Sequence, residues 1–379
     1  MNVPKLRFKG FNDEWKKIQL DSFVDINPKN DSLPEQFIYI DLESVNNGIL
    51  TTRKIINKSE APSRAQRTIK ENDILYQTVR PYQMNNLFVK NFDSDYPYIA
   101  STGYALLRTK ENPYFVYSIL YQKSFVNKVL DMCTGTSYPA ISANDLGTIT
   151  VGLPSLKEQE KISKTLELLD KKIELQSKKI EDLKLFKLYT KNQIFKDYDE
   201  IFKLKDILVK WNKKNKNNSV KYVESISNKY GFISQSDQFE DRNVASKDLR
   251  NYYIIEKGVF GYNPSRLNVG SLALKTNDKV SVVSPLYECF TTSQNNQYLL
   301  EWFDSKYFRK ETISKFEGGV RNTLNFSNLC EIKIGLPTIE KQNKYSRVFK
   351  IFNNKIEFEV KKLYKLQELK KGLMQSMFV

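Results

Sequence analysis

Apolar residues recur at alternating steps of four and three in two long, otherwise polar stretches of the chain. Each stretch follows a Gly-Leu-Pro run, at 152–154 or 335–337, and opens with a hydroxyl residue of the type that caps helices, Ser155 or Thr338. A 4/3 spacing is typical of a coiled-coil seam. Two long spacer helices are therefore predicted, within 152–195 and 335–379. Their seam positions are Ile162, Leu166, Leu169, Ile173, Gln176, Ile180 and Leu183, and then Tyr345, Phe349, Phe352, Ile356, Glu359, Leu363 and Leu366.

The two stretches are copies of one another. Residues 152–195 and 335–378 align without a gap at an offset of 183, and 14 of the 44 positions are identical, which is enough to establish a repeat. One apolar seam is unstable in water by itself, so we expect the two helices to pair. The alternative is two ordinary amphipathic helices, each packed on its own neighbouring domain.

The stretches between the helices indicate two globular domains. Residues 1–151 alternate short strand-like runs, such as 37–40, 74–76, 87–89 and 149–151, with turns rich in Asn, Asp, Gly and Pro, and 114–130 is expected to be helical after Pro113. Residues 196–334 repeat this layout more faintly, as when Glu71-Asn-Asp-Ile-Leu-Tyr76 matches Glu256-Lys-Gly-Val-Phe-Gly261. The predicted fold class is α+β, built as two half-chains that each consist of a domain and a long helix.

Charge and cysteine content limit the kinds of partner and site that this chain can have. The net charge is +16, of which +9 lies on 155–195 and 338–379, and this favours a polyanionic partner, although a charge run is also common on a solvated helix face. The three cysteines, Cys133, Cys289 and Cys330, are far apart, so neither a zinc site nor a disulfide framework is indicated. Without a signal-like start or a run of about 18 apolar residues, we expect a cytoplasmic protein.

Most catalytic chemistries have no candidate residues in this sequence. It contains no histidine, which excludes Ser–His, Cys–His and histidine–metal sites, and neither of the usual glycine-rich phosphate loops occurs. Tyr262-Asn263-Pro264-Ser265 only partly matches the Asn-Pro-Pro-aromatic loop of amino-methyltransferases. No compact carboxylate pair or metal-ligand spacing is present. The chain is therefore expected to bind rather than to catalyse, with no cofactor or metal of its own.

The doubled order of motifs resembles the specificity (S) subunit of type I restriction–modification enzymes. The residues that carry the resemblance are Gly135, Leu146 and Gly152-Leu-Pro154 with Glu158-Gln159, and again Gly318, Leu329 and Gly335-Leu-Pro337 with Lys341-Gln342. The opening Pro4-Lys-Leu-Arg-Phe8 through Trp15 is also similar to this family. One departure is Asn322-Thr-Leu324, which stands where the first half has Pro139-Ala-Ile141.

The resemblance implies two target-recognition domains, 1–151 and 196–334, which read the two halves of a split duplex DNA site. The helices would form an antiparallel coiled coil with a pseudo-twofold repeat, and two modification subunits, which carry S-adenosylmethionine, would dock on it. Restriction subunits, with motor and nuclease activity, would join them. Gln176 and Glu359 are the polar seam positions midway along their helices, so an antiparallel pair should bring them face to face.

Candidate DNA contacts are loop residues able to fork onto base edges or to bind phosphates. In the first domain they are Arg64, Arg67, Gln77, Arg80, Tyr82, Thr134, Ser137 and Tyr138. In the second they are Asn263, Arg266, Asn268, Arg321 and Asn322. Two other classes stay open: a scaffold for single-stranded nucleic acid, which would interleave basic and aromatic residues on a sheet face, and a two-arm adaptor without nucleic acid.

Overall fold

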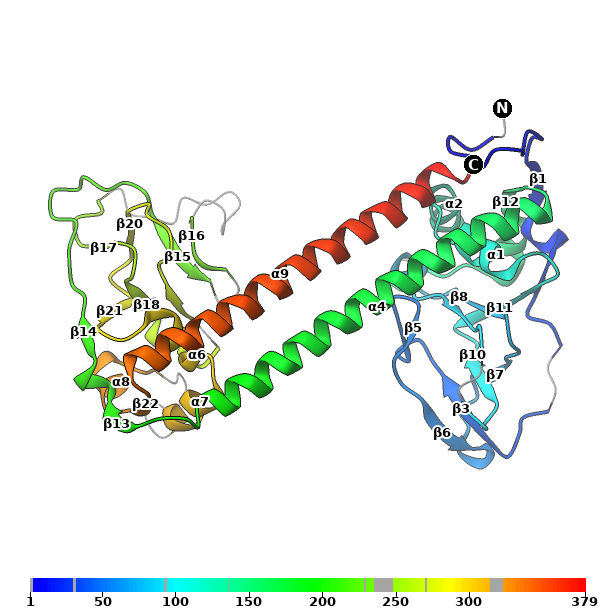
Figure 1. Ribbon diagram of the computed structural model, residues 1–379. Helices are drawn as coiled ribbons and strands as arrows, with labels where there is room; N and C mark the ends of the chain where they lie inside the picture. The colour runs from blue at the N-terminus through cyan, green and yellow to red at the C-terminus, as the bar shows by residue number, and fades with distance from the viewer. Residues whose placement is uncertain are drawn as a thin grey trace. The chain divides into compact units, whose positions relative to one another are not determined.

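The chain folds as two compact units (Figure 1). The computed structural model describes residues 3–29, 32–91, 94–135, 137–227, 230–234, 248–269, 271–313 and 323–379. Unit 1 comprises Met1–Ser177 and Lys361–Val379, and unit 2 comprises Lys178–Val360. The two cut points, after Ser177 and after Val360, are separated by the offset of the sequence repeat. Each unit therefore contains one globular domain and a part of each long helix.

The two long helices form where the seams predict them. Helix α4 spans Leu156–Ile194 and helix α9 spans Ile339–Ser376. The carbonyl of Ser155 accepts the first helical hydrogen bonds of α4, and Thr338 Oγ1 accepts from an amide in the first turn of α9. All fourteen seam positions are buried or half-buried. No helix among the described residues is both long enough and apolar enough to span a membrane.

Within each unit the two helices run antiparallel. In unit 1, Lys370 Nζ near the end of α9 lies 2.6 Å from Asp170 Oδ1 in the first half of α4. In unit 2, Lys187 Nζ near the end of α4 donates to Asn353 Oδ1 in the first half of α9 at 2.7 Å. Lys370 is the repeat equivalent of Lys187, and Asn353 is the repeat equivalent of Asp170. The same cross-helix contact thus occurs once in each unit, which confirms the antiparallel pair and its internal repeat.

The two polar seam positions are both buried. Gln176 is 6% exposed and Glu359 is 1% exposed. Within unit 2 the Glu359 carboxylate is neutralised by Lys179 of α4 at 2.7 Å and by Lys355 of its own helix at 3.1 Å. Lys179 and Lys355 therefore account for the buried charge at this position. That Gln176 and Glu359 face each other stays a prediction.

The domain of unit 1 is built from short strands and helices around two four-stranded sheets. Sheet order β2-β11-β8-β9 is antiparallel throughout, whereas order β6-β3-β10-β7 contains one parallel pair, β3 with β10. Ile38, Leu75 and Leu106 belong to one of the unit's buried cores. The elements are β1 Lys16–Gln19, η1 Leu20–Ser22, β2 Val24–Ile26, β3 Gln36–Ile40, β4 Val45–Asn46, β5 Ile49–Leu50, β6 Lys54–Asn57, η2 Lys58–Glu60, β7 Ala65–Thr68, β8 Ile74–Gln77, η3 Pro81–Gln83, β9 Leu87–Phe88, β10 Tyr98–Ser101, β11 Tyr104–Thr109, α1 Pro113–Ile119, α2 Lys123–Met132, α3 Ala143–Thr148 and β12 Thr150–Leu153.

The domain of unit 2 repeats part of this architecture. Its sheet β14-β21-β18-β19 has the strand order of β2-β11-β8-β9, and its pair β13–β22 corresponds to β1–β12. The predicted repeat of the α+β layout is therefore confirmed in these sheets. The elements are β13 Glu200–Lys203, η4 Leu204–Asp206, β14 Leu208–Lys210, β15 Glu224–Ser227, β16 Gly231–Ser234, β17 Tyr253–Ile255, β18 Phe260–Tyr262, η5 Pro264–Val269, β19 Leu272–Leu274, β20 Ser281–Val283, β21 Glu288–Thr292, α6 Asn296–Phe303, α7 Lys306–Ile313, α8 Phe326–Cys330 and β22 Lys333–Leu336.

The single helix expected over 114–130 is interrupted. Helix α1 ends at Ile119, and α2 begins after Gln122, whose extended backbone forms its N-cap. Leu120 is fully buried and Phe125 is 2% exposed. In a straight helix, side chains five residues apart point about 140° apart, so one helix could not direct both into the same core. The break resolves this conflict.

A buried glutamine ties each long helix to its own domain. In unit 1, Gln159 Nε2 donates to Pro154 O and Glu111 Oε2, while its Oε1 accepts from the amide of Asn112. In unit 2, Gln342 makes the equivalent bonds to Pro337 O, Gln294 Oε1 and the amide of Asn295. Asn112 and Asn295 are the N-caps of α1 and α6. The glutamine that follows each Gly-Leu-Pro motif, Gln159 or Gln342, therefore fixes the angle at which the long helix leaves its domain.

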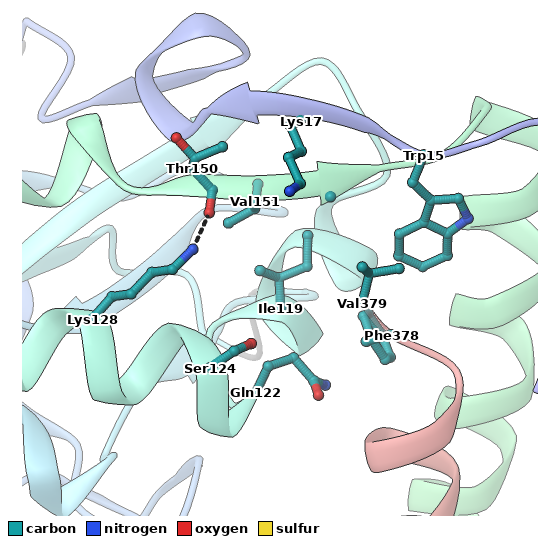
Figure 2. Close-up of a pocket in the computed structure, with 11 residues that line it drawn as sticks. Trp15, Lys17, Ile119, Gln122, Ser124, Lys128, Thr150, Val151, Phe378 and Val379 are labelled. Carbon is teal, nitrogen blue, oxygen red and sulfur yellow. Dashed lines mark hydrogen bonds between the residues drawn. The ribbon is translucent and has the colours of Figure 1, made fainter. Parts of the chain in front are cut away.

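The end of α9 is held in the core of unit 1. Phe378 stacks on Phe115 with ring centroids 5.3 Å apart and meets Trp15 edge-on at 6.2 Å. Figure 2 shows Trp15, Phe378 and Val379 beside β1 and β12, where they line a cavity of about 390 Å³. Lys128 and Thr150 also line this cavity, and Lys128 Nζ donates to the carbonyl of Thr150 at 2.8 Å. None of the predicted DNA-contact residues that the structure describes lines this cavity.

Candidate nucleic-acid interface

Three loops of unit 1 that carry predicted DNA contacts meet at one place. They are the turn before β7, the segment 77–84 after β8, and the segment 134–141. Main-chain hydrogen bonds join these loops to each other and to the β10–β11 turn, and they run from Ile141 N to Thr78 O (3.1 Å), from Arg80 N to Pro139 O (2.7 Å) and from Thr102 N to Arg64 O (2.9 Å). The predicted contacts on these three loops therefore lie close together in unit 1.

Gln77 holds the 77–84 loop rather than extending from it. The side chain is fully buried, and its Nε2 donates to Val79 O and Gln83 Oε1, both at 2.8 Å. Its Oε1 accepts from the amide of Asn85 at 3.1 Å. Its amide oxygen and nitrogen both make hydrogen bonds inside the loop, so in this conformation Gln77 positions other residues and is not presented to DNA.

Arg80 and Tyr138 form a pair at the junction of two loops. The Arg80 guanidinium carbon lies 4.3 Å from the centroid of the Tyr138 ring, which is a cation–π geometry, and Tyr138 is 63% exposed. Tyr82 on the same loop is 49% exposed. The residues most able to touch a partner thus project from this junction.

A cavity of about 840 Å³ opens beside this pair. Arg64, Arg80 and Tyr138 line it, together with Gln83, Asn85 and others that the sequence analysis did not select. Gln83 could have been found, because it directly follows the predicted contact Tyr82 on the same loop. Arg67 lies nearby on β7, where burial lowers the pKa of its guanidinium, and Thr134 and Ser137 are exposed on the 134–141 loop.

The arginines that the structure describes differ in their partners. Arg7, Arg108, Arg250 and Arg309 pair with carboxylates, as Arg108 does with Asp73 at 2.6 Å. Among the residues that the structure describes, the four predicted arginines have no carboxylate partner; they are Arg64, Arg67, Arg80 and Arg266. The Nε atoms of Arg67 and Arg80 are buried and have no hydrogen-bond acceptor there. An unneutralised cation at a loop junction is suited to a phosphate or a base edge.

The second domain carries the corresponding loop after β18. Asn263 is half-buried and its Oδ1 accepts from the amide of Ser265 at 3.0 Å, while Arg266 is exposed on η5. Leu324 N donates to Pro264 O at 3.1 Å, so the segment after residue 322 contacts this loop, as its repeat equivalent Ile141 contacts the loop after β8. Asn268 lies on η5 as well. Arg321 and Asn322 lie outside the described residues.

Part of the chain matches a described protein family. Residues 12–185 match the family described as type I restriction modification DNA specificity domain. The match covers somewhat less than half of the chain. The segment covers nearly all of the first domain and most of α4.

Two curated relatives are type I specificity subunits. The HindI specificity subunit of Haemophilus influenzae is 27% identical over 139 residues, which cover 35% of this chain and 30% of that protein. The MjaVIII specificity subunit of Methanocaldococcus jannaschii is 25% identical over 295 residues, which cover 69% of this chain and 68% of that protein. The match therefore spans less than a third of the first relative and about two thirds of the second.

Two solved structures share the fold. The type I restriction-modification S subunit from M. genitalium superposes with a TM-score of 0.59 at 16% identity, covering 100% of this chain and 99% of that one. A chain from a structure described as the basis of complex assembly and conformational transition of the type I R-M system gives 0.58 at 18% identity, with 97% and 98% covered. At these identities the comparison establishes the architecture.

Proposed function

We propose that this chain is the DNA-specificity subunit of a type I restriction–modification complex. Each globular domain would read one half of a bipartite duplex site, and the helices would set the spacing between the halves. The observation that carries the proposal is the repeat at the contact loops. Both domains place an arginine on the loop after equivalent strands β8 and β18, Arg80 or Arg266, and neither arginine has a carboxylate partner among the described residues. The family of residues 12–185 supports the same function.

The chain itself would not catalyse in this complex. Modification subunits would supply S-adenosylmethionine and methylate DNA, and restriction subunits would supply the motor and nuclease. Among the described residues there is no group of three or more Cys, Asp or Glu side chains arranged to hold a metal ion. The predicted contacts at this surface include hydrogen-bond donors and an aromatic ring, which suits recognition.

Two modification subunits would dock on the long helices. Several apolar side chains outside the seam are more than half exposed. Six of them form three pairs of repeat equivalents: Leu168 with Ile351, Leu175 with Phe358, and Phe186 with Leu369. Unit 1 contains one member of each pair and unit 2 contains the other. Equivalent apolar surfaces on both units favour two copies of one partner.

The docking proposal has a matched test. Leu175→Asp and Phe358→Asp should each remove one modification subunit from the complex, as measured by native mass spectrometry, and the double variant should remove both. Leu188→Asp is the control, because Leu188 is 53% exposed on α4 but its counterpart at 371 is a lysine. Full occupancy in the double variant would contradict this docking surface.

The function itself is tested on the assembled complex. This chain and its modification subunit should bind duplex DNA with an affinity that falls steeply with salt concentration, because phosphate contacts release counterions. Tighter binding to single strands would favour a single-strand scaffold, and no binding to either would favour an adaptor. Either outcome would refute the proposed function.

A further inference from the structure

The loops after β8 and β18 have the same local fold at equivalent positions of the repeat. In unit 1, Pro81 begins the 3₁₀ helix η3, and Gln83 N donates to Arg80 O at 3.0 Å. In unit 2, Pro264 begins η5, and Arg266 N donates to Asn263 O, also at 3.0 Å. Arg80 therefore corresponds to Asn263, and Gln83 corresponds to Arg266. We refer to 80–83 and 263–266 as the reading loops.

The reading loops carry the same two side-chain chemistries in opposite order. The first has an arginine at the position before proline and an amide three residues later, whereas the second has the amide first and the arginine last. Arginine forks onto guanine O6 and N7 in the major groove, and Asn or Gln forks onto adenine. One loop framework could thus present different donor orders to the two halves of a site.

Arg80 is held in place before any ligand arrives. Its backbone has φ 54°, in the left-handed region that residues other than glycine rarely adopt, and such strain is commonly kept at functional sites. Tyr138 lies against the guanidinium, and buried Gln77 fixes the loop from behind. Its Nε is buried without an acceptor among the described residues. Tyr138 and the loop held by Gln77 thus fix the position of the Arg80 guanidinium but leave its positive charge unpaired among the described residues.

Arg266 is the arginine of the second reading loop, at the position that Gln83 occupies in the first. It is exposed on η5 and has no ion-pair partner in the part of the chain that the structure describes. By contrast, Arg250 and Arg309 of the same unit each pair with an aspartate. Arg266 is therefore the arginine of this loop available to a ligand.

We infer that 80–83 and 263–266 are the base-reading loops of the two domains, and that Arg80 and Arg266 each read a guanine in the major groove. The inference rests on the proposed function and adds the base class that each domain recognises. It requires a G·C pair in each half-site. It also makes the two half-sites different, because the arginine occupies the first position of one loop and the last position of the other.

The experiment uses the complete complex and the DNA motif that it methylates. Arg80→Lys and Arg266→Lys keep the positive charge but lose the planar fork, so phosphate binding is retained while guanine readout is lost. Arg309→Lys, an exposed arginine outside the loops, is the control. Duplexes carrying 7-deazaguanine at one guanine at a time remove the N7 acceptor without changing the pairing.

Each lysine variant should lose about 5- to 100-fold in affinity for the motif, the loss expected for a bidentate arginine–guanine contact, and should keep its affinity for unrelated duplex. One 7-deazaguanine position per half-site should weaken the wild type and have no further effect on the corresponding variant. Wild-type affinity in both variants, an equal loss on every sequence, or a half-site without a G·C pair would overturn the inference. If the wild-type complex methylates no bipartite site, the proposed function fails instead.

Discussion

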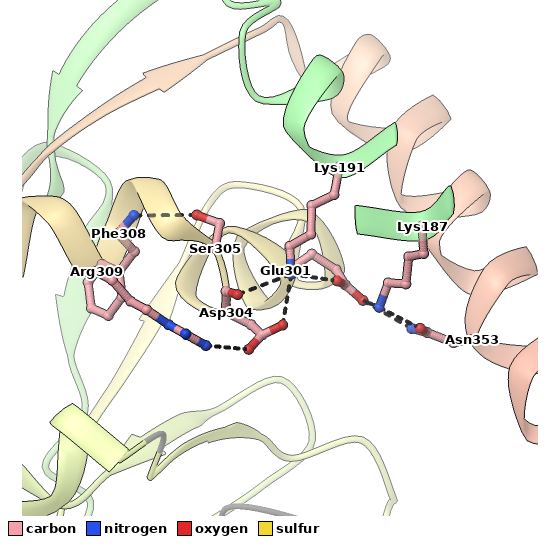
Figure 3. Close-up of polar contacts among 8 residues, drawn as sticks. All are labelled: Lys187, Lys191, Glu301, Asp304, Ser305, Phe308, Arg309 and Asn353. Atoms are coloured by element: carbon pink, nitrogen blue, oxygen red, sulfur yellow. Dashed lines mark hydrogen bonds and ion pairs between the residues drawn. The ribbon is translucent and has the colours of Figure 1, made fainter. Parts of the chain in front are cut away.

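Glu301 is the side chain whose removal should destabilise unit 2 most selectively. It lies on α6 with a 7% exposed side chain, and two lysines of α4 neutralise it: Lys187 Nζ is 2.9 Å from Oε1 and Lys191 Nζ is 3.1 Å from Oε2 (Figure 3). Asn353 of α9 donates to the same Oε1 at 3.0 Å. One carboxylate thus joins the domain of unit 2 to both long helices.

The structure sets the size of the effect of Glu301→Gln. At an effective dielectric constant of about 20, each ion contact at this distance is worth about 5 kcal/mol before desolvation is subtracted. Breaking a buried pair costs about 3–5 kcal/mol, because the remaining charge is left unpaired. Lys191 is 5% exposed, and its second partner, Asp304, is mostly in solvent. Because an amide keeps the hydrogen bond from Lys187, we expect a loss of about 3 kcal/mol, at the lower end of that range.

The measurement is urea unfolding combined with hydrogen exchange of peptides from α6 and α7. Exchange should accelerate in unit 2 and stay unchanged in α1 and α2 of unit 1. Asp304→Asn is the matched control: it also removes a carboxylate from Lys191, but its side chain is 70% exposed, so the loss should stay below about 1 kcal/mol. An Asp304→Asn variant as unstable as Glu301→Gln would refute the reasoning.

The pH dependence adds a second check on Glu301. Although burial alone would raise the pKa of its carboxyl, Lys191 and Lys187 hold it below the ordinary value of 4.5. A depressed folded pKa stabilises the protein above the unfolded pKa, and this stability is lost as the pH falls through the folded pKa. The difference between wild type and Glu301→Gln should therefore be constant from pH 8 to about 5 and shrink below about 4.5. A difference that grew on acidification would contradict this assignment.

Three further predictions concern the clamps, meaning the buried glutamines Gln159 and Gln342 that tie each long helix to its domain, and also Tyr138 and the two domains. Gln159→Ala leaves buried partners unpaired and should cost about 2–4 kcal/mol in unit 1, and Gln342→Ala should cost a similar amount in unit 2, as measured by hydrogen exchange; equal losses in both units for either variant would contradict separate clamps. Tyr138→Ala should weaken motif binding while Tyr138→Phe keeps it, because the ring and not the hydroxyl faces Arg80; equal affinities would remove the cation–π role. Replacing residues 1–151 with those of another specificity subunit should change one half of the methylated motif, and a change in both halves would refute modular reading.

Sequence reasoning found the features that depend on periodicity and repetition. The 4/3 spacing from Ile162 to Leu183, with the cap at Ser155, located helix α4, because burial of a seam fixes its period. It misjudged features that depend on how side chains pack and bond in three dimensions. Gln77 looks like any polar loop residue until Val79, Gln83 and Asn85 are placed around it. The break after Ile119 follows from how Leu120 and Phe125 share one core.

At the contact surface, too, the sequence located the loops but not the contacts that their side chains make. The sequence picked out the loops of Arg80 and Arg266 because donors follow strands there, and it could not show that Arg80 lies on Tyr138, which belongs to a distant segment of the chain. Nor could it separate arginines paired with carboxylates, such as Arg108, from those without a partner. The Glu301 network was missed because its members come from three separate helices. The roles of Arg80, Arg108 and Glu301 are determined by contacts with residues far away in the sequence, and local spacing does not reveal such contacts.

We propose that this chain determines which DNA sequence a type I complex recognises. The most direct measurement is a map of N6-methyladenine across genomic DNA from cells with and without the gene for this chain. The account predicts that one bipartite motif, with a G·C pair in each half, is methylated only when the gene is present. Identical methylation maps in the two strains, with the modification subunit expressed in both, would contradict it.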